Sequence, residues 1–420
     1  MSGKNYLNLH AIISHSPSCL NRDDMNMQKS AMFGGVRRVR ISSQSLKRAM
    51  RTNDYFKNNL GSPSVRSRNL DLLKERFVAE LKNDFDVAII RETIERFAKS
   101  KSTEQEGDNE ESEVIEEADS TEETMQVSKK IAVAPWVIDE IKALCGILVK
   151  VKKEGLSAEE EKAIKDKYDK QKGKKKKTLT ELQEEALNKK IDKAVKEKAD
   201  AVKKACASAH DIALCGRMAT SGLMTTIDGA VSVSHSITTH AVDADIDWFT
   251  AVDDLVPLGS GHLDTQEFSA GVFYRYASVN LKQLQLNLGL IPDMNAKETP
   301  ESRKKALEIC AHLVHLLATV VPSAKQKAFA AYNPADLVMA SFSDIPISAA
   351  NAFETPVERS GGYLQPSIKA FDDYIIRVYT GYGFDDKKAV FSLWNTNLEQ
   401  KKKTLENLKE WVRNNGEDKK

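Results

Sequence analysis

The chain has 420 residues, 41% of them hydrophobic and 29% charged, and its 62 Lys and Arg against 61 Asp and Glu leave a net charge of +1. This length is enough for two or three domains with a hydrophobic core, and the composition is that of an ordinary globular protein. No run of about eighteen apolar residues occurs, which argues against a membrane-spanning helix, and the N-terminal MSGKNYLNLH lacks the apolar core of a signal peptide, so we expect a cytoplasmic protein.

The first predicted element is a half-buried strand from Tyr6 to Ser14, in which alternate residues are apolar. A loop rich in Asn, Asp, Pro and Gly follows, and a helix then begins near Ser42, with Ser42 or Ser43 as its N-cap. Helical periodicity separates two faces of this helix. The apolar face carries Leu46, Ala49 and Met50, and another face carries Gln44, Lys47 and Arg51.

The segment from Met25 to Asn53 contains no acidic residue and has a local charge of +7. Such segregation in a nearly balanced chain indicates contact with a polyanion, and the alternative is a solvated helical face. The seven cationic residues are Lys29, Arg37, Arg38, Arg40, Lys47, Arg48 and Arg51.

Residues 56–228 are predicted to form a helical domain with two charged inserts. Helical patterns run from Leu70 to Lys99 and from Ala134 to Lys150. The first insert, 101–128, holds eleven acidic residues between Ser102 and Ser128, with no basic residue there, and is expected to be disordered. The second, 150–204, holds nineteen Lys against twelve acids and is expected to be solvated and dispensable for folding.

The C-terminal half predicts strands and helices in alternation. Strands are expected at 229–242, 271–279 and 337–347, a hairpin at 242–269, and helices at 303–320, 366–379 and 398–414. With the N-terminal strand this order approximates β-α-β-β-α-β, so the predicted class is α+β with a ferredoxin-like core. The cysteines are odd in number and form no CxxC pair, which favours free thiols over a disulfide framework or a zinc ribbon. They are Cys19, Cys145, Cys206, Cys215 and Cys310.

Long segments of the chain resemble one known family. The stretch from His10 to Arg51, HAIISHSPSCLNRDDMNMQKSAMFGGVRRVRISSQSLKRAMR, is similar to the N-terminal signature of the CasC family, the backbone subunits of the type I-E CRISPR surveillance complex, Cascade. Further similar segments are APWVIDEI, DIALCGRMATSG, SITTHAVDADIDWFTAVDDL, TQEFSAGVFYRYA, YNPADLVMASFSDIP and LKEWVRNNGE. The resemblance covers the chain except for its two charged inserts.

The resemblance implies a right-hand shape, with a modified RRM-like palm, helical fingers and a hairpin thumb. The corresponding boundaries are 1–55, 229–241 and 270–420 for the palm, 56–228 for the fingers and 242–269 for the thumb. It also implies a subunit without catalytic activity that assembles in several copies, about six, along the guide RNA, beside other Cascade subunits. The guide then pairs with target DNA, and a separate helicase-nuclease cuts it.

A subunit that carries any guide sequence is expected to contact phosphate and ribose rather than base edges. The residues that supply such contacts are Arg22, Lys29, Ser42, Gln44, Lys47 and Arg51. The sheet lacks the aromatic consensus of an ordinary RRM, so base stacking on it is not expected.

The hairpin is expected to carry a wedge that displaces one nucleotide at regular intervals. Trp248 and Phe249 precede Thr250 on a strand with little core of its own, and Met218 is an apolar candidate from outside the hairpin. Phe249, Thr250 and Met218 are expected at the displaced nucleotide. The alternative is that Trp248 or Phe249 packs the hairpin against the palm.

Two acidic groups support a rival function, that of a metal-dependent ribonuclease like the type III relatives of this family. They are Asp23 with Asp24, and Asp243 with Asp245 and Asp247. Aspartates in such positions more often cap turns or face solvent, so we expect no catalytic residue. His235 and His240 would lie on opposite faces of a strand, and no P-loop, Rossmann or nucleophile-elbow motif is present, so no metal or cofactor is expected. A third possibility is an RNA-binding module that acts alone, without self-association.

Overall fold

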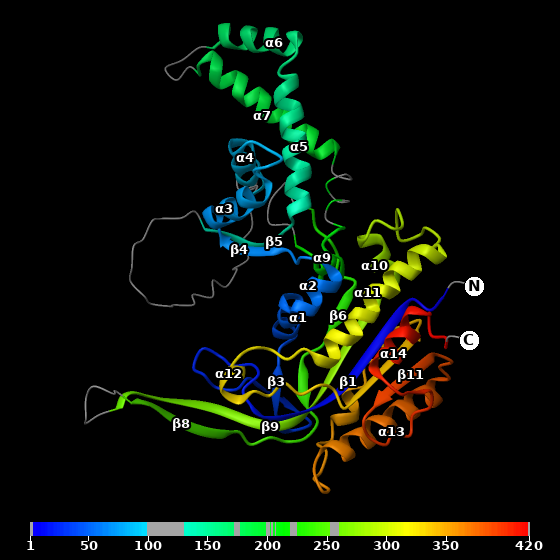
Figure 1. Cartoon of the computed structure of the whole chain (residues 1–420). Helices are drawn as coiled ribbons and strands as arrows, with labels where there is room; N and C mark the ends of the chain where they lie inside the picture. Colours follow the sequence, from blue (N-terminus) through cyan, green and yellow to red (C-terminus); the bar gives the residue numbers. More distant parts are fainter. Residues whose placement is uncertain are drawn as a thin grey trace. The chain divides into compact units, whose positions relative to one another are not determined.

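The computed structural model describes residues 3–98, 130–171, 177–198, 202, 205, 207–218, 225–252 and 260–418, with only the backbone described at 130–133, 249–252 and 260–264. These residues form two compact units of mixed α and β structure (Figure 1). Unit 1 comprises Met1–Pro63, Ala213–Cys215 and Gly229–Lys420, and unit 2 comprises Ser64–Ile212 and Gly216–Asp228.

Unit 1 is built around one large sheet whose strands come from both ends of the chain. The strand order is β12-β11-β10-β1-β9-β7-β3-β2, and β6 and β8 also pair with β9. The strands are β1 (Tyr6–Ser18), β2 (Ser30–Phe33), β3 (Val36–Ile41), β6 (Val231–Val233), β7 (Ser236–Thr238), β8 (Asp245–Val252), β9 (Ser260–Asn280), β10 (Leu337–Ser343), β11 (Lys387–Ser392) and β12 (Lys401–Lys402).

Strand β1 lies at the centre of this sheet and is antiparallel to both of its neighbours, β9 and β10. The expected strand is therefore present, but the expectation of a half-buried strand is wrong, because both of its faces are covered. Leu7 and Leu9 pack into one core, whereas Ile12 on the opposite face belongs to a second core. His10 is also fully buried on that second face, where its Nδ1 lies 2.8 Å from the hydroxyl of Tyr274.

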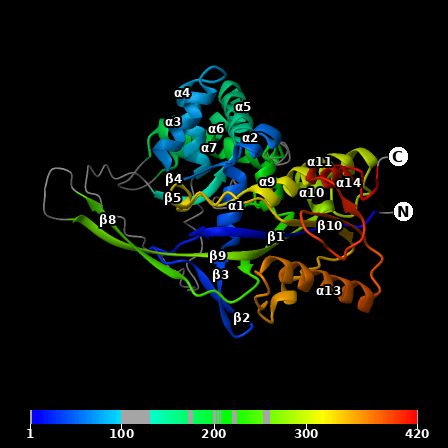
Figure 2. The same cartoon turned by 60° about the horizontal axis from the view of Figure 1, so that its bottom comes forward.

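Helices cover the two faces of the sheet (Figure 2). One core joins the sheet to α11 and α14, and the other joins it to α13 and a short 3-10 helix, η1. The helices of unit 1 are α1 (Ser43–Thr52), α2 (Asp54–Leu60), α10 (Leu281–Asn287), α11 (Pro300–Thr319), α12 (Gln326–Phe329), η1 (Ala350–Phe353), α13 (Leu364–Tyr382) and α14 (Leu405–Arg413). Helix α9 (His210–Cys215) spans a boundary between the units.

Some expected elements differ from those observed. Strand β11 was not predicted, and the last helix begins at Leu405 rather than at Leu398, because β12 precedes it. Helix α2 belongs to unit 1 rather than to the helical domain expected from residue 56, because Phe56 and Leu60 pack into the core of unit 1.

Unit 2 is mainly helical. Its core contains Phe77, Phe97 and Trp136, and a bidentate ion pair between Arg217 and Glu140 is fully buried beside it. Its elements are β4 (Val65–Asn69), α3 (Leu70–Leu81), α4 (Val87–Ala98), β5 (Lys130–Trp136), α5 (Ile138–Glu154), α6 (Ala158–Asp169) and α7 (Leu179–Glu197). The acidic insert, 101–128, lies outside the described residues.

The Lys-rich insert, 150–204, is not the solvated segment that its composition predicts. Ile191 and Val195 of α7 belong to the core of unit 2, and Ile164 of α6 and Leu182 of α7 are also buried. The apolar residues of α7 lie on one stripe of the helix, and its lysines lie outside that stripe. The described parts of the insert, 150–171 and 177–198, therefore belong to the fold, whereas residues 172–176 and most of 199–204 lie outside the described part.

Cys19, Cys145, Cys215 and Cys310 are free thiols, as expected, and Cys206 lies outside the description. Within the described ranges, no helix combines the length and the apolar character that crossing a bilayer requires.

Candidate nucleic-acid interface

Helix α1 begins as its sequence predicts. Ser42 is the N-cap, and its hydroxyl accepts a hydrogen bond from the backbone N–H of Ser45 at 3.2 Å. The N–H of Ser43 donates to Nδ1 of His235 at 2.9 Å, and the first turn contains no acidic side chain. Because the first turn has no acid, the positive end of the helix dipole is not neutralised by residues of the helix itself. Leu46 and Met50 are buried, so the opposite side of α1 remains available for contacts.

The loop after β1 is tied to the start of α1 by backbone contacts. The N–H of Lys29 donates to the carbonyl of Asn21, and the side-chain oxygen of Asn21 accepts from the N–H of Ser42 at 2.8 Å. The N–H of Arg40 donates to the carbonyl of Lys29, and Arg22 forms an isolated β-bridge with Gln28. The structure therefore brings together the backbone at Arg22, Lys29 and Ser42, three of the residues that the sequence suggests for RNA contact.

Gln28 anchors this loop to the sheet, a role that the sequence analysis missed. Its buried amide donates to the carbonyl of Ser18 at the end of β1 and accepts from the hydroxyl of Ser269 in β9. The carboxylate of Glu267 accepts from the N–H of Gln28 at 2.7 Å. The sequence around Gln28 does not indicate these contacts, because the residues that bind its amide lie on strands β1 and β9 and are not its neighbours in the loop.

Arg37 and Arg38, two cations of the acid-free stretch, have structural roles. Arg38 is fully buried and donates to the carbonyls of Thr238 and Phe353. Burial lowers its pKa. Arg37 forms an ion pair with Glu267 at 2.8 Å. The expected local charge of +7 is therefore reduced at the surface.

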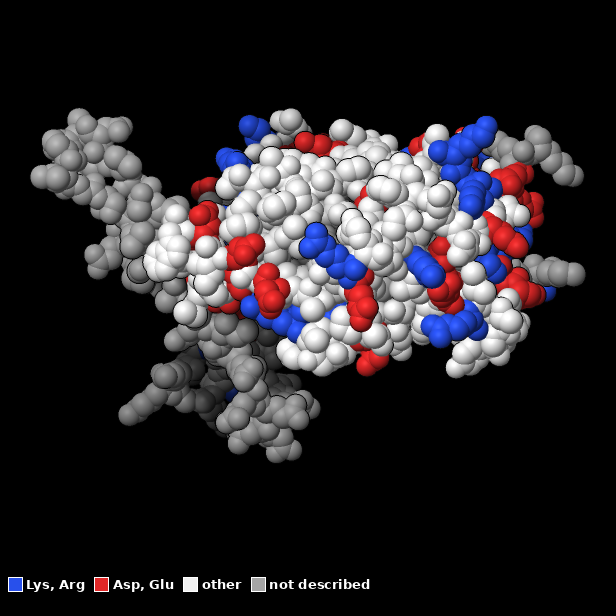
Figure 3. All heavy atoms as spheres, turned by 90° about the horizontal axis from the view of Figure 1, so that it is seen from below, with Lys and Arg blue, Asp and Glu red and all other residues white. Residues whose placement is uncertain are grey.

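The remaining cations include those singled out for nucleic-acid contact. Arg22 is exposed, Lys29 and Lys47 are partly exposed, and none of these three has an ion-pair partner among the described residues. Gln44 is exposed and Arg51 is partly exposed on the same helix. Seen from below, on the side where α13 lies, unit 1 carries its lysines and arginines as separated groups rather than as one band (Figure 3).

The β8–β9 hairpin extends from the large sheet, with Trp248 opposite Thr265 and Phe249 opposite Asp264 (Figure 1). Trp248 is 66% exposed and Ile246 is 57% exposed, so neither side chain is buried against the sheet. The side chains of Phe249 and Thr250 lie outside the description. Met218 belongs to unit 2 and is 82% exposed.

Exposed methionines near the basic loop are a further feature that the sequence analysis missed. Met25 is 80% exposed and Met32 is 70% exposed, the first within the loop and the second on β2. Their signal in the sequence is the occurrence of apolar residues inside a stretch that is otherwise polar and basic. Both side chains are exposed and therefore accessible to a ligand.

Three of the candidate metal-binding residues, Asp23, His235 and His240, have other partners. Asp23 closes a turn, since its Oδ1 accepts from the N–H groups of Met25 and Met27. His240 stacks on Tyr363 with ring centroids 3.7 Å apart, whereas His235 accepts from Ser43. Within the part of the chain that the structure describes, no group of three His, Cys, Asp or Glu residues is placed to hold a metal ion.

The chain is similar to proteins of one family. A family model described as CT1975-like protein matches residues 7–414. A chain of a solved structure described as a CRISPR RNA-guided surveillance complex, pre-nicking, is 27% identical, with a TM-score of 0.68 over 98% of this chain and 100% of that chain. A chain of a second CRISPR RNA-guided surveillance complex is 22% identical, with a TM-score of 0.50 over 97% of this chain and 98% of that chain, a likeness of fold alone. No curated protein matches the chain.

Proposed function

The chain belongs to the CT1975-like protein family, and from this membership we propose that it is a Cascade-type subunit of a CRISPR RNA-guided surveillance complex. The observation that carries the proposal is the likeness, at 27% identity over 98% of the chain, to a chain of such a complex. The segments quoted above, which resemble the CasC family, support the finer assignment to the backbone subunit of a type I-E complex.

We propose that the loop after β1 and the start of α1 contact the guide RNA. The donors are the side chains of Arg22, Lys29, Ser42, Gln44, Lys47 and Arg51. Lys47 and Arg51 lie one helical turn apart, on a helix whose first turn has no acid. These groups suit phosphate and ribose oxygens, and contacts to those oxygens do not depend on the base, which is what a subunit that carries different guides requires.

The anchoring of this loop supports the same proposal. A loop that binds a polyanion loses less conformational entropy when it is already held in place. Gln28 and Asn21 hold it through hydrogen bonds to β1, β9 and α1. The loop that carries these cations is therefore held in one conformation by hydrogen bonds before RNA binds.

The sheet of unit 1 is proposed to be the RRM-like palm, unit 2 the fingers, and the β8–β9 hairpin the thumb. Exposed Trp248 and Ile246 support the last assignment, because a hairpin with apolar side chains on its surface offers contacts to another molecule. Phe249, Thr250 and Met218 are proposed to lie at a displaced nucleotide. Several copies would then share one guide, beside other subunits, and pair it with target DNA.

The subunit is proposed to have no catalytic role and to act in the cytoplasm. The use of Asp23 in closing a turn favours a structural role for the nearest carboxylate. The ribonuclease alternative remains the second candidate, since Asp24 is exposed in the same loop.

The test is to purify the chain from cells that express a CRISPR array and to analyse the RNA it carries. We expect RNA of uniform length with guide sequences, and a particle mass that corresponds to several chains and falls after ribonuclease treatment. Protein that carries no RNA, or random fragments, would contradict the proposal. A single chain per RNA would instead indicate a module that acts alone.

A further inference from the structure

A large cavity lies in unit 1 between three segments that are far apart in the sequence. Its volume is about 1060 Å³, and it is lined by residues near the N-terminus, by the segment from Asn295 to Lys304, and by residues 413–415. The cavity lies beyond the start of β1, whereas the proposed RNA contacts follow its end. Because β1 has 13 residues, the two sites are separated by about 40 Å along the strand.

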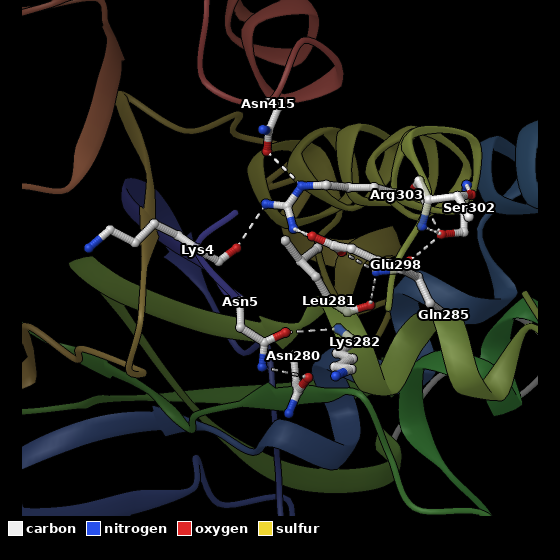
Figure 4. Close-up of polar contacts among 11 residues, drawn as sticks. Lys4, Asn5, Asn280, Leu281, Lys282, Gln285, Glu298, Ser302, Arg303 and Asn415 are labelled. Atoms are coloured by element: carbon white, nitrogen blue, oxygen red, sulfur yellow. Dashed lines mark hydrogen bonds and ion pairs between the residues drawn. The ribbon is translucent and has the colours of Figure 1, made fainter. Parts of the chain in front are cut away.

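Arg303 joins the three segments that form the wall (Figure 4). Its Nε donates to Oδ1 of Asn415 at 2.9 Å, its Nη1 donates to Glu298 at 3.0 Å, and its Nη2 donates to the carbonyl of Lys4 at 2.8 Å. Gly3 passes directly over the guanidinium, since a Cβ at this position would lie 2.7 Å from Cζ of Arg303. The wall is thus held by several hydrogen bonds.

Further hydrogen bonds hold Glu298 in place. The amide of Gln285 donates to its carboxylate at 3.0 Å, and the hydroxyl of Ser302 donates to Oε1 of Gln285 at 2.6 Å (Figure 4). Thr299 and Ser302 form the capping box of α11. Both carboxylate oxygens of Glu298 accept hydrogen bonds from Arg303, and one also accepts from Gln285. The negative charge of Glu298 is therefore partly neutralised and repels an anionic ligand only weakly.

The charges that line the cavity do not cancel. Of its two carboxylates, Glu298 pairs with Arg303, and Asp344 accepts from Lys4 at 2.6 Å. Arg413 is neutralised by Glu308 and Glu406. The three other cations on the wall are Lys282, Lys297 and Lys304, and none of them has an ion-pair partner among the residues that the structure describes. Three positive charges therefore face the cavity without compensation.

We propose that this cavity binds the phosphate groups of a single-stranded nucleic acid, at a site distinct from the guide-RNA interface. Lysines are compact cations that suit phosphate oxygens, and the asparagines on the wall supply neutral donors. Among the described residues that line the cavity none is aromatic, so these residues offer bases no stacking platform and the proposed contact is independent of sequence. The volume is at the upper limit of small-molecule sites, about 1,000 Å³, which suits a strand better than a metabolite.

Lysine footprinting tests the site directly. The full-length protein, with any RNA it carries, is acetylated with and without single-stranded DNA of about 20 nucleotides, and each lysine is quantified by mass spectrometry. We expect the DNA to reduce acetylation of Lys282, Lys297 and Lys304 several-fold. Exposed lysines elsewhere on unit 1, Lys327, Lys369 and Lys403, serve as controls and are expected to change little.

Substitution gives the second measurement. The triple variant K282Q/K297Q/K304Q is expected to bind the DNA about tenfold more weakly and to reduce the salt slope by about 2, since each contact on a single strand contributes about 0.7. The control variant K327Q/K369Q/K403Q is expected to bind like wild type. Unchanged acetylation of the three lysines, or unchanged affinity of the first variant, would overturn the proposal.

Two further outcomes separate this proposal from others. Protection of the three lysines by an oligoglutamate peptide but not by DNA would identify an acidic protein segment as the ligand and overturn the nucleic-acid assignment. The proposal does not rest on guide-RNA binding, so the footprint is expected to persist in a K47A/R51A variant. Loss of the footprint in that variant would show that the cavity is not a separate site.

Discussion

At the scale of single residues, Lys47 and Arg51 test the proposed RNA contact most directly. The K47A/R51A variant is expected to bind guide RNA at least tenfold more weakly, and its salt slope is expected to fall by about 1.4, since two contacts to a single strand are lost. The measurement is anisotropy of a labelled guide RNA over a range of salt concentrations.

The control for this experiment is K369A/R377A, which removes two exposed cations from α13. It is expected to retain wild-type affinity, and both variants are expected to unfold at the wild-type urea concentration. Equal affinity and slope in the two variants would show that Lys47 and Arg51 belong to a solvated face.

His10 makes the stability of unit 1 depend on pH. Its ring is fully buried, and desolvation lowers its pKa to about 3. Because an unfolded histidine has a pKa of about 6.5, the unfolded chain binds this proton first, and stability is lost as the pH falls below that value. Between pH 7 and pH 5 the loss from His10 is about 2 kcal/mol.

The variant H10Q removes this titration and retains a side chain that can bond the hydroxyl of Tyr274. Its free energy of unfolding is expected to fall by about 2 kcal/mol less than that of wild type between pH 7 and pH 5, measured by urea unfolding. His15, whose pKa is also lowered to about 3, remains in the variant, so some pH dependence is expected to persist. An identical pH dependence in both proteins would contradict this account.

At the scale of elements, α7 shows that the Lys-rich insert contributes to stability. Ile191 is 1% exposed and packs in the core that contains Phe97 and Trp136. The variant I191A is expected to destabilise unit 2 by about 2–4 kcal/mol, because it leaves a cavity in a packed core. K189A on the same helix removes an exposed side chain and is expected to change stability by less than about 0.5 kcal/mol. Urea unfolding of the two variants distinguishes a packed helix from a solvated one.

The hairpin of β8 and β9 allows a test of the proposed nucleotide displacement. The variant M218A/F249A is expected to reduce the regular break in the guide–target duplex, because a bulky apolar wedge would no longer replace lost stacking of about 1–3 kcal/mol per base. The measurement is the periodic reactivity of guide bases to chemical probes in the assembled complex.

The matched control for the hairpin is I246A, which removes an exposed apolar side chain from β8. It is expected to leave the periodic reactivity unchanged. If the pattern persists in M218A/F249A as well, these residues have a packing role, and the wedge assignment fails.

At the scale of the whole molecule, we expect the assembled protein to have no nuclease activity. RNA or DNA complementary to the guide is expected to remain intact when it is incubated with the assembled protein and Mg²⁺. Electrophoresis of labelled targets measures this. Cleavage at regular spacing that is abolished by D24A or by D243A/D245A/D247A would establish the ribonuclease alternative, whereas cleavage that persists in D23A, in D24A and in D243A/D245A/D247A would indicate a contaminant.

Several features of this protein follow from its sequence alone, because near neighbours along the chain determine them. Ser42 caps α1, and Leu46 and Met50 form its buried side, since both effects depend on residues within a few positions. The strand that begins at Tyr6 and the hairpin around Trp248 likewise follow from local alternation and turn residues. The resemblance to CasC proteins also rests on the sequence, and the family match and the solved structure support its coarser part, a Cascade-type protein.

Only the tertiary structure decided which polar and charged residues are buried and which faces are covered. Arg38 is counted by the sequence among the surface cations, yet it bonds the carbonyl of Phe353, 315 positions away. Strand β1 is covered on both faces because α11 and α13, each hundreds of residues away, pack against it. Ile191 lies among lysines in the sequence and enters a core through helical periodicity. Composition records which side chains are present, whereas burial depends on the partners that distant segments bring to them.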